Sequence, residues 1–130
     1  MSQENVEIVR RLHEVEDVDE ALSLFDPSVV MTNVAGAPET APYLGHDGVR
    51  KWVEVTRDAI GAFRLEADEI IDADENRVIV VGRVCGQGPS SGLPFELQLS
   101  TVYTLRRGRI VEARAYRTKD EALEAAGLSE

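Results

Sequence analysis

Cysteine is almost absent from this chain, and histidine is nearly as rare. Cys85 is the only cysteine, so an internal disulfide and a zinc site built on cysteines are both excluded. Its apolar surroundings (VIVVGRVCG) indicate an inert buried thiol rather than a nucleophile. With only His13 and His46 as imidazole ligands, and no second histidine four residues after His13, we expect no bound metal. A chain without disulfides fits a reducing compartment, so the expected location is cytoplasmic.

The sequence also lacks a long hydrophobic run and an excess of basic residues. No apolar run approaches membrane-spanning length, and the acidic start SQENVE is unlike a signal peptide. The 14 lysines and arginines stand against 24 acidic residues, and the net charge of −10 repels phosphate backbones and anionic membranes. Neither nucleic acid nor a membrane is therefore an expected partner.

Cofactor-binding motifs are missing as well. The segment GQGPSSG (86–92) lacks the lysine of a phosphate-binding loop and precedes a strand pattern rather than a helix. The segment DADENR (72–77) begins like a calcium-binding loop, but Arg77 and Arg83 stand where such a loop needs glycine and glutamate. We therefore expect no cofactor.

Hydrophobic periodicity predicts three helices in the first half of the chain and a short one at its end. Residues 4–15 repeat apolar side chains at helical spacing. Asp17, with an acid three residues later, resembles a capping box and predicts a second short helix through Phe25. Residues 46–60 are the third predicted helix, with Gly61 as its stop. The segment KDEALEAAGL is the fourth.

The other periodic segments read as strands. They cover 28–34, 63–72, 78–86 and two stretches between Gly92 and Thr118 that an RRGR turn joins. Alternation places four apolar residues of 63–72 on one face: Phe63, Leu65, Ala67 and Ile71. Helices first and an antiparallel meander last indicate an α+β fold rather than a parallel α/β sheet. A chain of 130 residues is expected to be a single domain, 1–130.

Five segments in this order carry a resemblance to a known family. They are EIVRRLHEV, DVDEALSLFDPSV, YLGHDGVRKW, VYTLRRGRIVEARAY and DEALEAAGL. Together they resemble SnoaL-like proteins of the nuclear transport factor 2-like superfamily. The resemblance implies a cone-shaped α+β barrel, in which three helices from the N-terminal half lie over the concave face of a curved, mostly antiparallel sheet. It also implies a homodimer through the outer sheet face. Members include ketosteroid isomerases, polyketide cyclases, epoxide hydrolases and dehydratases, so the fold alone assigns no reaction.

The resemblance also indicates which positions carry catalytic groups in relatives. Ketosteroid isomerases place a carboxylate base on the first strand and a protonated carboxyl on the penultimate strand, and these positions match Thr32 and Thr101. A threonine hydroxyl forms hydrogen bonds but cannot act as a base near pH 7. The tyrosine of the first helix matches Leu12 or His13. Limonene-type epoxide hydrolases need Arg-x-Asp on the strand that here reads LQLSTVYTL. Neither activity is therefore expected.

Residues on the inner face of the predicted sheet are the candidate ligand contacts. Trp52 matches an aromatic pocket position on the third helix; the alternative is a core tryptophan. Small residues on facing strands, including Gly82 and Ala115, favour a cavity unless Trp52 and Leu99 fill it. Arg117 could bind a ligand carboxylate at the wide end; the alternative is an exposed strand-end arginine. The candidate ligand-binding residues are Thr32, Trp52, Leu99, Thr101, Tyr103, Ala115 and Arg117.

His13 is the one candidate for acid–base catalysis, because it lies near a pocket-facing position and an unperturbed imidazole titrates close to neutral pH. A lone helical histidine is more often structural, and this alternative stays open. His46 is expected to cap the third helix or to face solvent. On the outer face, Ile79 and Val102 belong to a mixed apolar and polar surface that is the expected dimer contact.

Three functions remain open from the sequence. The missing acids favour the first, a domain that binds a small, largely apolar molecule. The second is an enzyme of the same fold, a polyketide cyclase, isomerase or dehydratase that uses acid–base chemistry. The third is a structural dimerisation domain whose own side chains fill the cavity. A cavity of about 300 Å³ or more favours binding over scaffolding, and a buried ionisable group with a shifted pKa favours catalysis.

Overall fold

The computed structural model describes residues 2–34, 42–87 and 94–128. The elements follow in the order α1 (Ser2–Leu12), α2 (Val18–Leu22), β1 (Phe25–Thr32), β2 (Tyr43–Leu44), α3 (Gly45–Ile60), β3 (Phe63–Asp72), β4 (Arg77–Gln87), β5 (Pro94–Arg106), β6 (Arg109–Tyr116) and α4 (Lys119–Ala125). The strands form one sheet in the order β2-β1-β6-β5-β4-β3. Only the β1–β6 pair is parallel in this sheet. The predicted α+β fold with a mostly antiparallel sheet is confirmed.

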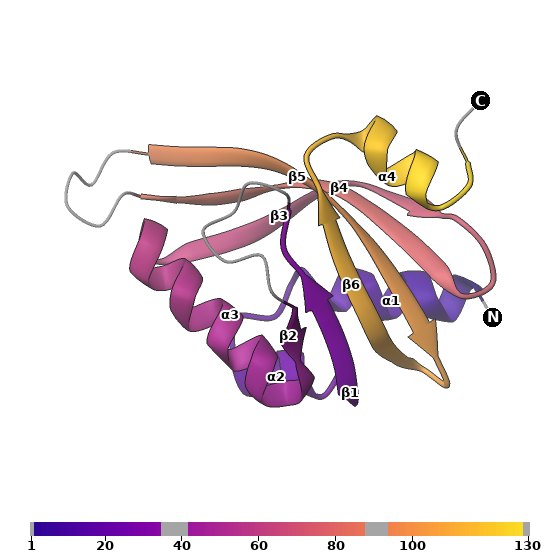
Figure 1. Ribbon diagram of the computed structural model, residues 1–130, viewed down its shortest axis with the longest axis horizontal. Helices are drawn as coiled ribbons and strands as arrows, with labels where there is room; N and C mark the ends of the chain where they lie inside the picture. Colours follow the sequence, from indigo (N-terminus) through magenta and orange to yellow (C-terminus); the bar gives the residue numbers. More distant parts are fainter. Residues whose placement is uncertain (1, 35–41, 88–93, 129–130) are drawn as a thin grey trace.

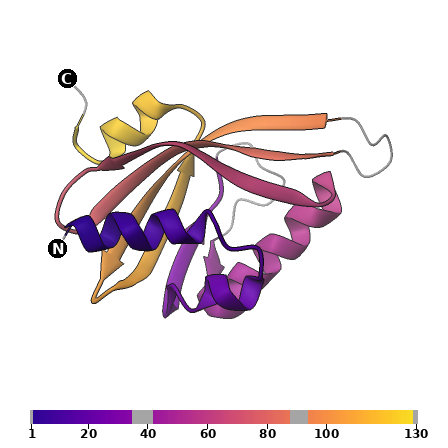
Figure 2. The same cartoon turned by 180° about the vertical axis from the view of Figure 1, so that it is seen from behind.

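The sheet is curved, and the helices lie on both of its faces. In Figure 1, β3, β4 and β5 bend along their length, and α1, α2 and α3 lie on one side of them. Figure 2 shows the same arrangement from behind, with α4 alone on the opposite side of the sheet. The three helices of the N-terminal half therefore cover the concave face, as the family resemblance implies.

Helix ends differ from the prediction where a local signal was misread. The first helix ends at Leu12 rather than at residue 15, so His13 lies in the turn after it. Asp17 caps α2 as predicted, but its side chain accepts from the backbone N–H of Asp19. Phe25 begins β1 instead of ending a helix.

Two connecting segments fall partly outside the structural description. Within 35–45, the described part contains the short strand β2, which pairs with β1 and was not predicted. Residues 35–41, and residues 88–92 of the GQGPSSG segment, lie outside the described residues. The RRGR turn is confirmed: Arg107 and Gly108 both have positive φ, 53° and 77°, as a two-residue hairpin turn requires.

A β-bulge in β3 changes which face its second half presents. The pairing of β3 with β4 shifts register between Ala67 and Glu69. The extra residue reverses the alternation beyond it. Ile71 therefore packs with Ile79 on the outer face, and Ile70 packs against the inner core. The prediction that Ile71 shares the face of Phe63 and Leu65 was wrong for this reason.

The inner and outer faces of the sheet each carry a hydrophobic cluster. On the inner face, α1, α2 and α3 pack on the sheet through residues that include Val9, Leu22, Val49, Val80 and Ile110. On the outer face, Ala122 and Ala126, from α4 and its C-terminal end, pack on Ile79, Val81 and Val102.

The chain's own C-terminal helix covers the apolar residues that were expected at a dimer contact. Ile79 is 0% exposed and Val102 is 7% exposed within a single chain. These two positions are thus already buried, and the expectation that they need a second copy to cover them was wrong. The homodimer itself stays a prediction, and it would have to use the rest of the outer face.

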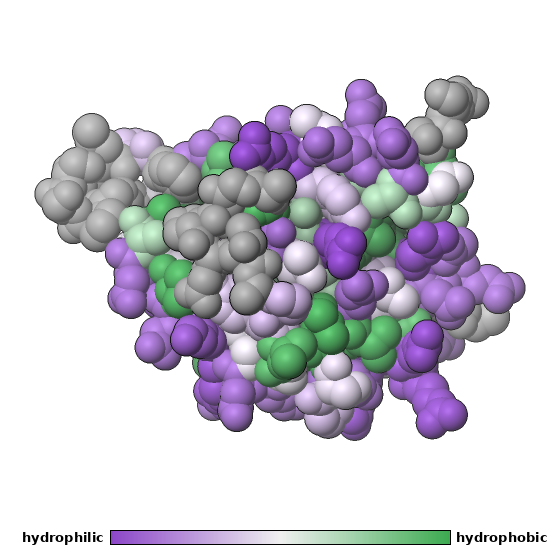
Figure 3. Space-filling view, viewed as in Figure 1, coloured by the Kyte–Doolittle hydropathy of each residue, from purple (hydrophilic) through white to green (hydrophobic). Residues whose placement is uncertain are grey.

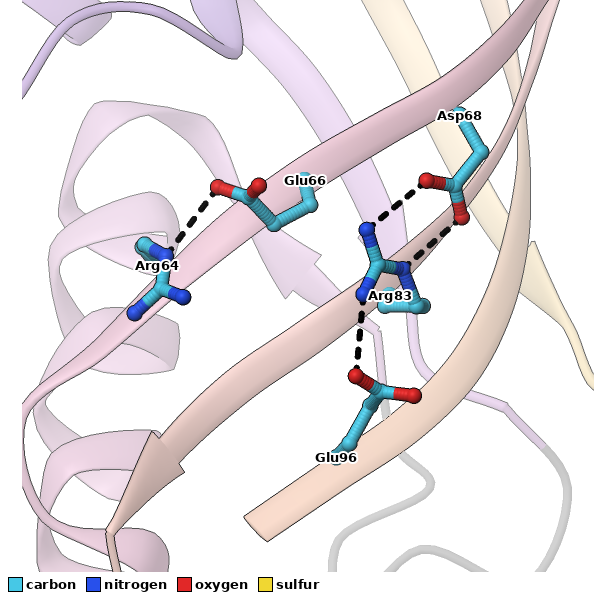
Figure 4. A network of polar contacts seen from close by, with 5 residues as sticks. All are labelled: Arg64, Glu66, Asp68, Arg83 and Glu96. Carbon is cyan, nitrogen blue, oxygen red and sulfur yellow. Dashed lines mark hydrogen bonds and ion pairs between the residues drawn. The ribbon is translucent and has the colours of Figure 1, made fainter. Parts of the chain in front are cut away.

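The outer face beyond α4 is polar. Arg83 on β4 donates to both carboxylate oxygens of Asp68, at 2.8 and 2.9 Å, and to Glu96 at 2.9 Å (Figure 4). These hydrogen bonds raise the pKa of the Arg83 guanidinium further above its ordinary value. Arg64 and Glu66 form a second pair on β3. The network holds the bulged part of β3 against β4 and β5.

The surface seen in Figure 3 is largely hydrophilic, with a hydrophobic patch over β1 and β2. Leu44 on β2 is 66% exposed. None of the described helices combines the length and the apolar character needed to cross a bilayer.

Candidate functional site

A cavity of about 470 Å³ lies between the concave face of the sheet and the helices. Its walls come from the α1–α2 connection, the end of β1, α3, and the inner faces of β3, β4, β5 and β6. Strand curvature creates this space, because a bent sheet and straight helices cannot touch along their whole length. Neither Trp52 nor Leu99 fills it; both line its wall.

Six of the seven residues predicted to contact a ligand line this cavity. They are Thr32, Trp52, Leu99, Thr101, Tyr103 and Ala115. Arg117 is exposed and is not among the lining residues. Strand β6 ends at Tyr116, and the chain turns there toward α4 on the opposite face, where the Arg117 backbone N–H donates to Glu121. Whether the six residues contact a ligand stays a prediction.

His13 and Tyr103 form the central polar pair of the cavity. Nε2 of His13 lies 3.1 Å from the Tyr103 hydroxyl. The two rings meet edge to face, with centroids 5.9 Å apart. Tyr103 is 4% exposed. The pair joins residues 90 positions apart, so the turn after α1 is held directly over β5.

Burial sets the protonation of this pair. Removal of the ring from water lowers the pKa of His13 from 6.5 to about 4, and contact with the backbone of Leu65 offsets this only in part. That contact does not reach hydrogen-bond geometry, since Nδ1 is buried without a hydrogen-bond partner among the described residues. Burial also raises the pKa of the Tyr103 phenol. At neutral pH both side chains are uncharged.

Trp52 is positioned by two neighbours at the cavity wall. Its indole N–H donates to Oδ1 of Asn33 at 2.9 Å, and its ring meets Phe63 edge to face with centroids 5.6 Å apart. These contacts hold the indole at the boundary of the cavity rather than across it. Asn33, which also lines the cavity, thus uses its side-chain carbonyl oxygen to orient Trp52.

Carboxylates lie only at the edge of the cavity in the described part of the chain. Glu14, Glu16 and Asp17, from the α1–α2 connection, are exposed. Glu66 is half-buried, and its side chain pairs with Arg64 on the outer side of the sheet. The two positions that hold acids in ketosteroid isomerases carry Thr32 and Thr101. Hydroxyl groups of Thr32, Thr101 and Tyr103 and the neutral imidazole of His13 therefore line the interior.

Gly82 lines the cavity, but the space that it leaves is taken up by the backbone of β3. An ideal Cβ at this position would lie 2.1 Å from the carbonyl oxygen of Glu66. The bulge in β3 brings its backbone over β4 here, and only glycine leaves room for it. Gly82 is therefore needed for the bent sheet itself and not simply to leave volume in the cavity.

The other candidate groups have structural roles. Nε2 of His46 donates to the carbonyl of Phe25 at 2.9 Å and ties α3 to β1. Cys85 is free and buried. Within the described residues no cluster of His, Cys, Asp or Glu could hold a metal ion.

Sequence reasoning placed His13 and Tyr103 near the cavity separately but missed their pairing. It also missed Leu65 as the backbone neighbour of the imidazole. The only available signal was that each residue falls on a predicted inward position, and such a pattern does not specify which side chains meet.

The family model of the SnoaL-like domain matches residues 9–113. No curated protein matches the chain significantly. Solved structures share its fold. An NTF2-like protein of unknown function from Burkholderia pseudomallei is 24% identical, with a TM-score of 0.77 over 93% of this chain and 95% of that one. TerC, co-crystallised with polyporic acid, is 21% identical, with a TM-score of 0.78 over 95% and 98%. A candidate SnoaL-like polyketide cyclase from Jannaschia sp. CCS1 is 18% identical, with a TM-score of 0.74 over 98% and 94%.

Proposed function

The chain belongs to the SnoaL-like domain family, and from this premise we propose that its cavity binds a small, largely apolar molecule. The cavity volume of about 470 Å³ carries the proposal. It falls within the range of about 300–1,000 Å³ that is usual for small-molecule sites. A structural domain with a filled interior would leave no such space.

The lining supports an apolar ligand with one polar end. Leu12, Val49, Val80 and Leu99 contribute aliphatic surface. His13, Thr101 and Tyr103 contribute polar groups to the lining, and the first and last of them lie 3.1 Å apart. Apolar surroundings with a few convergent polar groups are typical of sites that orient a ligand by a single functional group. TerC, which shares the fold, was co-crystallised with polyporic acid, and this also supports a small-molecule ligand.

Titration with 2-tetralol, a small bicyclic alcohol, tests the proposal. Trp52 is the only tryptophan and lines the cavity, so its fluorescence should report binding. Ala115→Leu places three more carbons in the cavity and should weaken binding at least about tenfold. Ala125→Leu makes the same change at an exposed position of α4 and should leave the affinity unaltered. Equal affinity for wild type and Ala115→Leu would place the binding elsewhere and refute the proposal.

Proton transfer in the same cavity is the second candidate function. The observation that favours it is the hydrogen bond between His13 and Tyr103 at 3.1 Å. A neutral imidazole can accept a proton from a bound carbon acid, although a pKa of about 4 makes it a weak base.

Hydrogen exchange separates the two candidates. The C–H groups beside the carbonyl of 2-tetralone exchange in D2O, and NMR follows the loss of their signals. Exchange faster than in buffer that disappears in His13→Gln would support proton transfer. Exchange at the buffer rate would leave binding as the function.

We further propose, in line with the family, that the protein forms a homodimer through the polar part of the outer face around Arg83. Sedimentation of the wild type and of Arg83→Glu tests this. A monomeric wild type would contradict it.

A further inference from the structure

Trp52 contacts both sides of the gap that the curved sheet leaves open. The sheet runs in the order β2-β1-β6-β5-β4-β3, so β1 and β3 are four strand spacings apart, about 19 Å in a flat sheet. The indole N–H donates at 2.9 Å to Asn33, which directly follows β1. The same ring meets Phe63, the first residue of β3, with centroids 5.6 Å apart. One side chain therefore spans the gap between these two strands.

Helix α3 carries the indole into this gap. The helix follows β2 directly and leads into β3, so it runs from one side of the gap to the other (Figure 2). Trp52 lies in its middle and lines the cavity together with Asn33 and Phe63. The indole has a single donor, and Asn33 accepts it. The hydrogen bond therefore holds the ring in the orientation in which it forms this part of the cavity wall.

The gap and the buried phenol lie toward different ends of the cavity. Tyr103 pairs with Val78 on β4, whereas Phe63 pairs with Gly86, eight residues further along the same strand. Eight residues of an extended strand correspond to about 26 Å. A ligand whose polar group reaches the Tyr103 hydroxyl therefore extends its other end toward the indole.

On the premise that the cavity binds a small apolar molecule, we infer that Asn33 is a positioning residue that limits the length of the ligand through Trp52. A ligand that fits behind the indole binds without disturbing it. A longer ligand has to turn the ring out of the gap, and this breaks the hydrogen bond to Asn33. Such a bond favours the closed orientation about two- to tenfold, and the affinity for the longer ligand falls by that factor.

Calorimetric titration with 2-tetralol and 6-butyl-2-tetralol measures this limit. The two compounds share the hydroxyl, and the butyl chain extends from the opposite end of the ring system. In an open site each buried methylene tightens binding about fourfold, and the wild type should gain less than this from the chain. Asn33→Leu and Asn33→Ala remove the acceptor. Both should raise the affinity for the long compound relative to the short one about two- to tenfold over wild type.

Two further variants serve as controls. Asn33→Asp keeps an acceptor oxygen for the indole N–H and should keep the wild-type ratio. Thr56→Val removes the hydrogen bond that Oγ1 of Thr56 donates to the Trp52 carbonyl at 2.7 Å, and Thr56 does not line the cavity. It should also keep the ratio, which separates the orientation of the indole from a general loosening of α3.

Fluorescence reports the position of the indole without any ligand, because Trp52 is the only tryptophan. Acrylamide should quench it more strongly in Asn33→Leu and Asn33→Ala than in wild type, since the ring then turns toward solvent more often. Asn33→Asp should resemble the wild type. Equal quenching in all four proteins would overturn the inference.

The titrations separate the inference from the binding function. A ratio that is the same in wild type, Asn33→Leu and Asn33→Ala would overturn the inference and leave the binding function standing. A wild type that gains the full fourfold for each methylene would do the same. If neither compound binds the wild type, the binding function fails and the inference fails with it.

Discussion

The burial of His13 predicts a pH dependence of stability that a single substitution should remove. The folded-state pKa of about 4 lies below the ordinary value of 6.5. Between these values the unfolded chain binds a proton that the folded protein does not. Protonation therefore favours unfolding as the pH falls, and stability should rise with pH across this window and level off above 6.5.

The magnitude follows from the two pKa values. Each unit of pKa difference corresponds to about 1.4 kcal/mol, so the full effect below pH 4 is about 3 kcal/mol. Between pH 7 and pH 5 the same linkage relation gives a loss of about 2 kcal/mol. The pKa values of Asp26 and Asp74 are also lowered, but from 3.8, so these acids act below this interval.

Urea denaturation at pH 7, 6 and 5, followed by the fluorescence of Trp52, measures the effect. The wild type should lose about 2 kcal/mol of unfolding free energy over this range. His13→Gln removes the titrating ring and should lose correspondingly less. His46→Gln removes the other imidazole while leaving the surroundings of His13 intact, so it should keep most of the wild-type slope.

Parallel pH profiles for wild type and His13→Gln would refute the reasoning. The comparison uses slopes, so a lower overall stability of the variant does not affect it. NMR titration of the His13 ring gives an independent reading, and a pKa near 6.5 in the folded protein would contradict its burial as described.

Two further substitutions test the sheet and its covering helix. Gly82→Ala forces a methyl group against the Glu66 carbonyl oxygen, which lies 2.1 Å from the ideal Cβ. The unfolding free energy from urea denaturation should fall by about 1–3 kcal/mol. A change below about 0.5 kcal/mol would show that β3 does not approach β4 so closely. Ala122→Glu places a charge in the fully buried contact between α4 and Ile79, so it should lower the melting temperature by several degrees or more. An unaltered melting curve would mean that α4 does not cover the outer face.

Local patterns were sufficient for most of the fold. The 3.6-residue spacing located α1 and α3, and the period of two located β3 and the closing hairpin, because each pattern reports which side of one element is buried. Gly108 indicated the turn between β5 and β6, because glycine readily adopts the positive φ that the turn requires. Five inward strand positions also reached the cavity, since alternation on a strand fixes the face of each side chain, and Trp52 reached it from α3.

Long-range packing decided what those patterns could not encode. The bulge near Asp68 reversed the face of Ile71. Periodicity could not predict the bulge, because a single unpaired residue leaves no periodic pattern. The docking of α4 determined that Ile79 and Val102 are covered within one chain. Arg117 lies outside the cavity lining because β6 ends one residue before it.

The amino-acid sequence by itself determined the helices, the strands and the absence of acids at the two threonine positions, since these depend only on neighbouring residues and residue type. The tertiary structure alone decided that His13 meets Tyr103 in a space shielded from water. A pKa of about 4 and the hydrogen bond between His13 and Tyr103 arise only when side chains 90 positions apart are buried together, and burial is a property of the assembled fold.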